Sequence, residues 1–202
     1  MRIFLDTANI EHIRHGVSLG VISGVTTNPS LVSKEGKRDY KELVKEICKI
    51  VPGEVSVEVL KQDAEGMVKQ AREIATWAEN IAVKIPATLA GVEATSVLSR
   101  DGIKVNFTLC FSLNQALLGA IAGATFISPF VGRLDDIGHD GMALVREMVE
   151  VFAKYSFTTQ VLAASIRHPQ HCVAAAKAGA AIATVPYEVL MQMIRHPLTD
   201  IG

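Results

Sequence analysis

One lysine stands inside an apolar run of strand length, Ile81-Ala82-Val83-Lys84-Ile85-Pro86. Burying an ammonium group costs free energy, so a fold keeps such a lysine if the side chain reaches water, meets an anion or works as an amine. Loss of water favours the uncharged amine, which is the form that attacks a carbonyl carbon. Lys84 is therefore the first candidate for covalent chemistry, and a strand-end lysine that reaches water is the structural alternative.

Polar side chains of complementary types stand at the ends of other strand-like segments. They are Asp6, Asn28, Glu58, Asn106, Thr108, Ser128, Ser165 and Arg167. Carboxylates, an amine and amide or hydroxyl donors are the groups that Schiff-base chemistry on a carbonyl compound requires. Each residue taken singly also suits a helix cap or a turn, so the prediction depends on the whole set.

Two arginines, Arg133 and Arg167, could hold a phosphate, because a guanidinium group binds phosphate in a bidentate manner. A solvated loop charge is the alternative, and residue type alone favours it for Arg133. The adjacent pair Asp135-Asp136 could bind a cation, although a polar loop or a helix start is the preferred interpretation.

Histidines recur at a spacing of i, i+3 in two places, His12 with His15 and His168 with His171. This spacing can serve a metal ion, but no third ligand lies nearby in the sequence. We interpret all four as solvated histidines near helix ends and predict no metal site. The sequence also contains no Walker A motif, dinucleotide fingerprint or nucleophile elbow.

Strand-like and helix-like segments alternate along the chain and must position these residues. The predicted strands are Arg2 to Asp6, Ile22 to Thr27, Glu54 to Val59, Ile81 to Pro86, Ile103 to Thr108, Thr125 to Phe130, Thr158 to Ala164 and Ala181 to Val185. Helical spacing or caps predict helices between them, including Tyr40 to Val51 and Asp140 to Tyr155. Eight such units of about 25 residues indicate an α/β fold, a (β/α)₈ TIM barrel in a single domain, with an open doubly wound sheet as the alternative.

The alternation of side chains along each strand supports the barrel. With Lys84 facing inward, Val83 and Ile85 face the helices, as the outer layer of a barrel requires. Phe107 likewise lies between the inward Asn106 and Thr108. Because the active site of such a barrel lies at the carboxyl ends of its strands, the polar residues are expected to meet at one rim.

The composition limits the classes of function. The chain has 202 residues with 49% apolar content, enough for one sizeable core, and a net charge of −1 with dispersed basic residues. We therefore predict no nucleic-acid or membrane partner. The start of the sequence resembles no signal peptide, and Cys48, Cys110 and Cys172 lack CxxC spacing, so a cytoplasmic protein with buried thiols is expected.

Several motifs, in this order and spacing, resemble the small transaldolases and the related fructose-6-phosphate aldolases. They are FLDTAN, GVTTNPSL, VSVEV, VKIP, VNFTL, ISPFVGRLDDIG, ASIRHP and VPYEVL, and together they span essentially the whole sequence. The resemblance implies a (β/α)₈ barrel over residues 1–202 that moves a dihydroxyacetone group between sugar phosphates. It implies no metal and no organic cofactor.

The resemblance also implies roles for individual residues. Lys84 would form the Schiff base, Asp6 would take the proton of the C4 hydroxyl as the C3–C4 bond breaks, and Glu58 with Thr108 would act through a water. The substrate hydroxyls and the phosphate would be held by the remaining set: Thr26, Asn28, Asn106, Ser128, Phe130, Arg133, Ser165 and Arg167.

Transaldolase is preferred over aldolase because the aldolase relatives carry Tyr where this chain has Phe130 and Gln where it has Glu58. A non-catalytic barrel that binds phosphorylated sugars is the alternative of another class. The resemblance further implies a homo-oligomer, a decamer or pentamer. Family members continue into a C-terminal helix beyond the point where this sequence ends, at Gly202, so the domain is expected to lack that helix.

Overall fold

Eight parallel strands close into a barrel in the computed structural model, which describes residues 1–36 and 39–202. The strands are β1 (Arg2–Asp6), β2 (Ile22–Thr26), β3 (Val55–Glu58), β4 (Ile81–Pro86), β5 (Val105–Cys110), β6 (Phe126–Pro129), β7 (Gln160–Ala163) and β8 (Ile182–Val185). Leu5 of β1 pairs with Val25 of β2 on one side and with Val185 of β8 on the other. The barrel is confirmed, and the open-sheet alternative is wrong because β1 and β8 are hydrogen-bonded neighbours.

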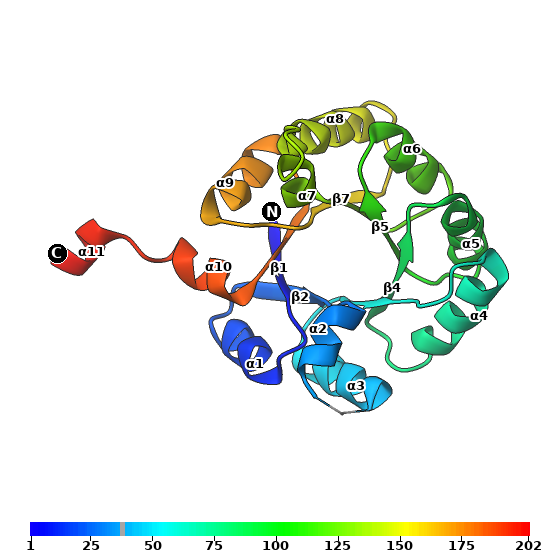
Figure 1. Cartoon of the computed structure of the whole chain (residues 1–202), viewed down its shortest axis with the longest axis horizontal. Helices are drawn as coiled ribbons and strands as arrows, with labels where there is room; N and C mark the ends of the chain where they lie inside the picture. The colour runs from blue at the N-terminus through cyan, green and yellow to red at the C-terminus, as the bar shows by residue number, and fades with distance from the viewer. Residues whose placement is uncertain (37–38) are drawn as a thin grey trace.

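Helices surround the ring of strands, as Figure 1 shows. They are α1 (Ile10–Ser18), α2 (Pro29–Lys34), α3 (Tyr40–Ile50), α4 (Ala64–Ala75), α5 (Leu89–Arg100), α6 (Leu113–Ile121), α7 (Val131–Asp135), α8 (Gly141–Lys154), α9 (Pro169–Ala178), α10 (Tyr187–Met193) and α11 (Pro197–Ile201). The short helices α7 and α11 were not predicted, because five residues are too few to display a helical period.

Side-chain caps fix where several helices begin. The Asn28 side chain accepts from Leu31 N and caps α2, whose first residue is Pro29. Ser112 caps α6 in the same way through Gln115 N. The Gln115 side chain departs from a complete capping box, because it accepts from Phe111 N and donates to Ala87 O instead.

Strand alternation produces two separate apolar layers. The larger core lies between the strands and the helices and includes Val83, Ile85 and Phe107, which are fully buried. A smaller cluster, formed by Phe4, Ala82, Phe126, Leu162, Ala164 and Ile182, fills the inside of the barrel. A Cβ at Gly24 would lie 2.5 Å from Phe4 Cζ, so the missing side chain on β2 makes room for this inner phenylalanine. The interior is packed except at the rim.

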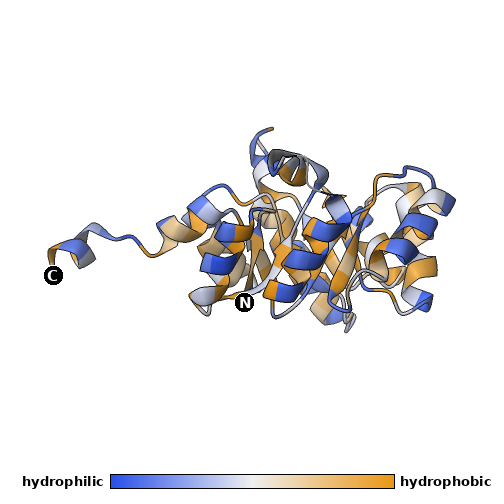
Figure 2. Cartoon of the chain, turned by 90° about the horizontal axis from the view of Figure 1, so that it is seen from below, coloured by the Kyte–Doolittle hydropathy of each residue, from blue (hydrophilic) through white to orange (hydrophobic). Residues whose placement is uncertain are grey.

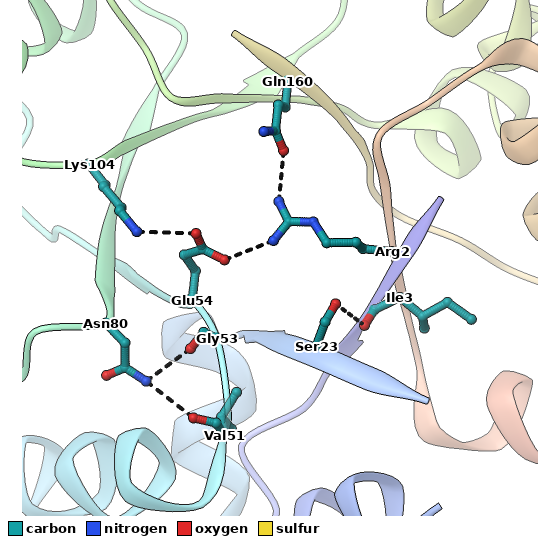
Figure 3. A network of polar contacts seen from close by, with 9 residues as sticks. All are labelled: Arg2, Ile3, Ser23, Val51, Gly53, Glu54, Asn80, Lys104 and Gln160. Carbon is teal, nitrogen blue, oxygen red and sulfur yellow. Dashed lines mark hydrogen bonds and ion pairs between the residues drawn. The ribbon is translucent and has the colours of Figure 1, made fainter. Parts of the chain in front are cut away.

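The amino end of the barrel is closed by a polar network, drawn in Figure 3. Arg2 donates to Glu54 Oε2 at 3.1 Å and to Gln160 Oε1 at 2.7 Å, and Lys104 Nζ donates to Glu54 Oε1 at 3.1 Å. These four residues stand at the starts of the odd-numbered strands and point inward, as alternate strands do within one layer of such a barrel.

The chain leaves the barrel after β8. Figures 1 and 2 show α11 projecting beyond α10, away from the ring of helices. Its residues Leu198 and Ile201 are 71% and 82% exposed, so the tail buries no apolar side chain in the monomer. No helix in the described part of the chain is long and apolar enough to cross a membrane. Cys48, Cys110 and Cys172 are buried free thiols, as expected.

Candidate active site

A cavity of about 230 Å³ opens at the carboxyl end of the barrel. The structure brings every predicted site residue except Glu58 to its wall: Asp6, Thr26, Asn28, Lys84, Asn106, Thr108, Ser128, Phe130, Arg133, Ser165 and Arg167. Ala164, Ile166, Thr184 and Pro186 also line the cavity and were not predicted as site residues. The strand-end polar residues therefore meet at one rim, as alternation predicted.

Lys84 is buried, with only 6% of its surface exposed. Its Nζ lies 3.0 Å from Glu58 Oε2 and donates to the carbonyl oxygen of Thr27, also at 3.0 Å. Glu58 reaches the amine because it pairs directly with Lys84 in the β3–β4 register. The alternative of a lysine that reaches water is wrong for Lys84: the amine faces a carboxylate that can receive its proton.

Asp6, at the end of β1, lies in the same pocket. It accepts a hydrogen bond from Thr26 Oγ1 at 2.8 Å, and Thr26 Oγ1 lies 2.6 Å from Thr184 Oγ1. Burial raises the pKa of the Asp6 carboxyl, and the positive charge of Lys84 opposes that rise. A carboxyl group whose pKa is moved toward neutrality can both accept and return a proton under physiological conditions.

Amide and hydroxyl groups line the floor of the cavity. Ser128 Oγ donates to Asn106 Oδ1 at 2.6 Å, and Asn106 Nδ2 donates to Ser56 Oγ at 3.0 Å. Thr108 Oγ1 is buried and has no hydrogen-bond partner among the residues that the structure describes. A buried hydroxyl without a partner costs the fold free energy unless water or a ligand meets it, so the Thr108 hydroxyl can form a hydrogen bond with a polar atom in the cavity.

The two arginines occupy the outer part of the cavity. The guanidinium of Arg133, on α7, lies over the Phe130 ring at 4.9 Å. The guanidinium of Arg167 pairs with Asp136 Oδ2 at 2.7 Å. Ser165, which also lines the cavity, adopts a left-handed backbone with a φ of 59°, which is rare for a residue with a side chain. Arg133 is thus a cavity residue and not merely a loop charge.

Asp135 and Asp136 were wrongly interpreted as a polar loop or a helix start, because they end the unpredicted helix α7. His171 was wrongly interpreted as a solvated histidine: its side chain is 12% exposed and its Nε2 lies 3.0 Å from Asp135 Oδ2. The contact between His171 and Asp135 is not visible in the sequence, since the two residues are far apart along the chain. Thr184 could have been found, because it shares the inward face of β8 with Ile182.

The described residues contain no group of three or more His, Cys, Asp or Glu side chains arranged to hold a metal ion. His12 instead stacks on Tyr187 with ring centroids 3.9 Å apart, and His15 Nδ1 lies 2.6 Å from the Tyr187 hydroxyl. These contacts tie α1 to α10 on the outside of the barrel.

Comparison with known proteins points to one family. The sequence profile described as Transaldolase/Fructose-6-phosphate aldolase matches residues 3–201. Proteins named "Probable transaldolase" from Dehalococcoides mccartyi and Heliobacterium modesticaldum are 64% and 60% identical, and each alignment covers 100% of this chain and 94% of the relative. Another with this name, from Methanococcus maripaludis, is 58% identical with the same coverage.

A solved structure, thiamine phosphate pyrophosphorylase from Pyrococcus furiosus, shares the barrel at a TM-score of 0.63 and 13% identity. The alignment covers 95% of this chain and 93% of that one. At this identity the likeness concerns the fold alone, because one barrel supports many chemistries.

Proposed function

The chain belongs to the transaldolase/fructose-6-phosphate aldolase family, as its motifs indicated, and from this premise we propose that it is a transaldolase acting through a Schiff base on Lys84. It would convert sedoheptulose 7-phosphate and glyceraldehyde 3-phosphate to erythrose 4-phosphate and fructose 6-phosphate, a reaction of the pentose phosphate pathway in the cytoplasm. The observation that carries the proposal is the buried amine of Lys84, 3.0 Å from the Glu58 carboxylate and open to a polar cavity.

The first step forms the imine. Transfer of one ammonium proton from Lys84 to Glu58 leaves the neutral amine, which adds to the C2 carbonyl of the donor sugar. The resulting carbinolamine loses its hydroxyl as water, and a carboxyl proton from Glu58, relayed by a water on Thr108, supplies the proton that this departure needs. The protonated imine then withdraws electrons from the C3–C4 bond.

Asp6 would serve the cleavage. As the C3–C4 bond breaks, Asp6 takes the proton of the C4 hydroxyl, the aldose phosphate leaves, and the bond electrons remain in an enamine on Lys84. Addition of the enamine to the acceptor aldehyde reverses these movements, with Asp6 returning the proton. The enamine must persist until the acceptor arrives, so Asn28, Asn106 and Ser128 would hold the hydroxyls of the bound group.

Arg133, Ser165 and Arg167 would hold the phosphate. They stand at the outer part of the cavity, and their guanidinium and hydroxyl groups suit phosphate oxygens. Arg133 has no carboxylate within ion-pair distance among the described residues, so an incoming anion does not need to displace one there.

Borohydride reduction in the presence of fructose 6-phosphate, followed by peptide mass mapping, tests the proposal. The expected result is a stable adduct on Lys84 alone. A label on another lysine, or no label, would contradict it. The same experiment excludes or supports a non-catalytic sugar-phosphate-binding barrel, which would bind the sugar without a reducible adduct.

The related aldolase activity is the second candidate, and Phe130 separates the two. A tyrosine hydroxyl at this position could position a water or act as an acid in the release of free dihydroxyacetone. The Phe130 ring has no hydroxyl; it packs edge-on against Phe111, with ring centroids 5.8 Å apart, and lies under the guanidinium of Arg133. Transfer to erythrose 4-phosphate should therefore be much faster than release, and Phe130→Tyr should raise the release rate. Comparable turnover of fructose 6-phosphate with and without the acceptor would favour the aldolase.

We also propose a homo-oligomer. The exposed apolar residues Ile194, Leu198 and Ile201 lie on the projecting tail, and an apolar groove that includes Ile3, Leu19, Val21 and Leu190 lies beside α10. Covering these surfaces in a second copy would remove apolar area from water. A monomer by light scattering at micromolar concentration would refute the oligomer.

A further inference from the structure

Two histidines follow Arg167, and the structure treats them differently. His171 is largely buried and contacts residues of two other segments. His168, three positions earlier, is exposed. Its ring is tilted by 44° against that of His171, with the centroids 3.8 Å apart, and it forms no hydrogen bond to any part of the chain that the structure describes. The contacts of His171 need a physical account, because neither histidine lines the cavity.

His171 uses both ring nitrogens. Nε2 lies 3.0 Å from Asp135 Oδ2, and Nδ1 lies 3.3 Å from the backbone nitrogen of Arg167, which can only donate. The two contacts together assign the proton of the neutral ring to Nε2, with Nδ1 as the acceptor. Asp135 is itself anchored, because its Oδ1 accepts from Gly141 N at 2.9 Å. The start of α8, the end of α7 and the backbone of Arg167 are thus joined in one chain of contacts.

The same two segments meet at three further points. Val131 N donates to Ala164 O at 3.0 Å, Gly132 N donates to Ser165 O at 3.1 Å, and Asp136 holds the Arg167 guanidinium. A Cβ at Gly132 would stand 2.6 Å from Arg167 Nε, so Arg167 passes directly over this glycine. Helix α7 and the segment after β7 are therefore fitted against each other at the level of the backbone.

This fit is needed because the segment after β7 is strained. Ser165 holds a φ of 59°, a left-handed backbone conformation that is unfavourable for a residue with a side chain. Such a conformation persists only where several surrounding contacts fix it. Two such contacts flank Ser165. Gly132 N donates to the carbonyl oxygen of Ser165, and the Nδ1 of His171 accepts from the backbone nitrogen of Arg167, two residues further along.

We propose that His171 and Asp135 are positioning residues that hold the backbone of Arg167, and with it Ser165, in the geometry that receives the phosphate of the substrate. This role rests on the proposed function of Arg167 and Ser165 in phosphate binding. His171 touches no substrate; it acts through the Arg167 peptide. Its loss should weaken binding of phosphorylated sugars and leave chemistry at Lys84 intact.

The test compares two ketoses, fructose 6-phosphate and dihydroxyacetone. They share the dihydroxyacetone unit around the reacting carbonyl, and dihydroxyacetone lacks C4 to C6 together with the phosphate. For each protein, borohydride trapping on Lys84 is measured against sugar concentration. His171→Phe removes both hydrogen bonds, His171→Asn retains only an acceptor near the Nδ1 position, and His168→Asn is the matched control. We expect His171→Phe to raise the half-saturating concentration of fructose 6-phosphate about tenfold, since one lost hydrogen bond to a charged or backbone group commonly costs that much.

The remaining results follow from the same reasoning. The half-saturating concentration of dihydroxyacetone should stay unchanged in all variants, His171→Asn should lie between wild type and His171→Phe, and His168→Asn should match wild type. Equal shifts for both sugars would show general disruption and overturn the positioning role, as would no shift for either. If His171→Phe does not fold, the comparison of His171→Asn with His168→Asn decides by the same criterion.

Failure of the proposed function gives a different result. If wild-type protein forms no adduct with either sugar, Schiff-base chemistry is refuted, and calorimetry with inorganic phosphate then judges the positioning role. Weaker phosphate binding in His171→Asn than in His168→Asn would support it. Equal binding, or none in the wild-type protein, would overturn it.

Discussion

Each end of the barrel carries an ionic cluster with members at the ends of β1 and β3, and the two clusters differ in charge balance and burial. At the amino end, Arg2 and Lys104 share the single carboxylate of Glu54, and the side chains of both cations are more than a third exposed, at 39% and 47%. At the carboxyl end, Lys84 stands between the carboxylates Glu58 and Asp6 with 7% of its side chain exposed. Two cations share one carboxylate in the first cluster, whereas one cation meets two carboxylates in the second.

The pKa values of the carboxyl groups follow this difference. Burial acts to raise the pKa of Glu54, but its hydrogen bonds to the backbone, Lys104 and Arg2 outweigh burial and hold the value below the ordinary one. Burial dominates at Asp6 and raises its pKa, because the charge of Lys84 and the hydrogen bond from Thr26 together do not compensate for it. Matched charges near water stabilise the fold modestly, whereas a buried and poorly matched carboxyl group is available for proton transfer.

The largest expected contrast is between the two paired lysines. Lys84 Nζ lies 3.0 Å from Glu58 and Lys104 Nζ lies 3.1 Å from Glu54, so their ion pairs are similar in length. Lys84→Met should abolish the reducible adduct and lower turnover on the order of 10⁵-fold, as loss of a nucleophile does. Lys104→Met should leave turnover of the folded enzyme unchanged. Steady-state kinetics and trapping of both variants check this, and a large kinetic effect of Lys104→Met would remove the functional difference between the two ends.

The next contrast lies at the two ends of β1. Asp6→Ala should still form the adduct on Lys84 but lose carbon–carbon bond cleavage by about 10²- to 10⁴-fold, because it removes a proton acceptor and not the nucleophile. Arg2→Met, at the other end of the strand, should lose stability without a change in the cleavage rate. Parallel trapping and cleavage assays separate the steps. Loss of trapping together with cleavage in Asp6→Ala would instead indicate a structural role for Asp6.

Glu54→Gln tests the amino end by stability. The change leaves Arg2 and Lys104 without their shared anion, so the free energy of unfolding should fall by about 1–3 kcal/mol at neutral pH. The effect of Glu58→Gln on unfolding should be smaller, because Lys84 also donates to Thr27 O. Urea denaturation of both variants measures the difference. A larger loss for Glu58→Gln would show that the carboxyl-end pair contributes more to folding.

The smallest expected effects are opposite pH dependences. The lowered pKa of Glu54 makes its contribution to stability full above the ordinary glutamate range, and this contribution is lost as the pH falls from that range through the lower folded value. The raised pKa of Asp6 means that the folded state is disfavoured as the pH rises from the ordinary aspartate range through the higher folded value. The stability gained by Asp6→Asn should therefore grow with pH, and the stability lost by Glu54→Gln should also grow. The free energies of unfolding of both variants and of the wild-type protein, measured across the acid range, check this. A stability difference between either variant and wild type that does not change with pH would contradict it.

The rim residues were predictable because strand alternation is local. Adjacent side chains on a strand point to opposite faces, so Val83 and Ile85 facing the helices placed Lys84 inward. The same rule placed Asn106 and Thr108 inward on either side of Phe107. Boundaries were less accurate. The fifth strand runs from Val105 to Cys110 instead of Ile103 to Thr108, because Ile103 N bonds back to Leu98 O and closes the turn after α5.

By itself the sequence determined the order of strands and helices, the helix caps and the residue types that face into the barrel, since each depends on neighbours within a few positions. Only the tertiary structure decided that the sheet closes, that Lys84 meets Glu58 and the carbonyl of Thr27, and that His171 reaches Asp135 and Arg167. These contacts join residues on separate strands and helices. Their distances are set by how the whole barrel packs, because a ring closed by β1 and β8 fixes each rim residue through the positions of all eight strands.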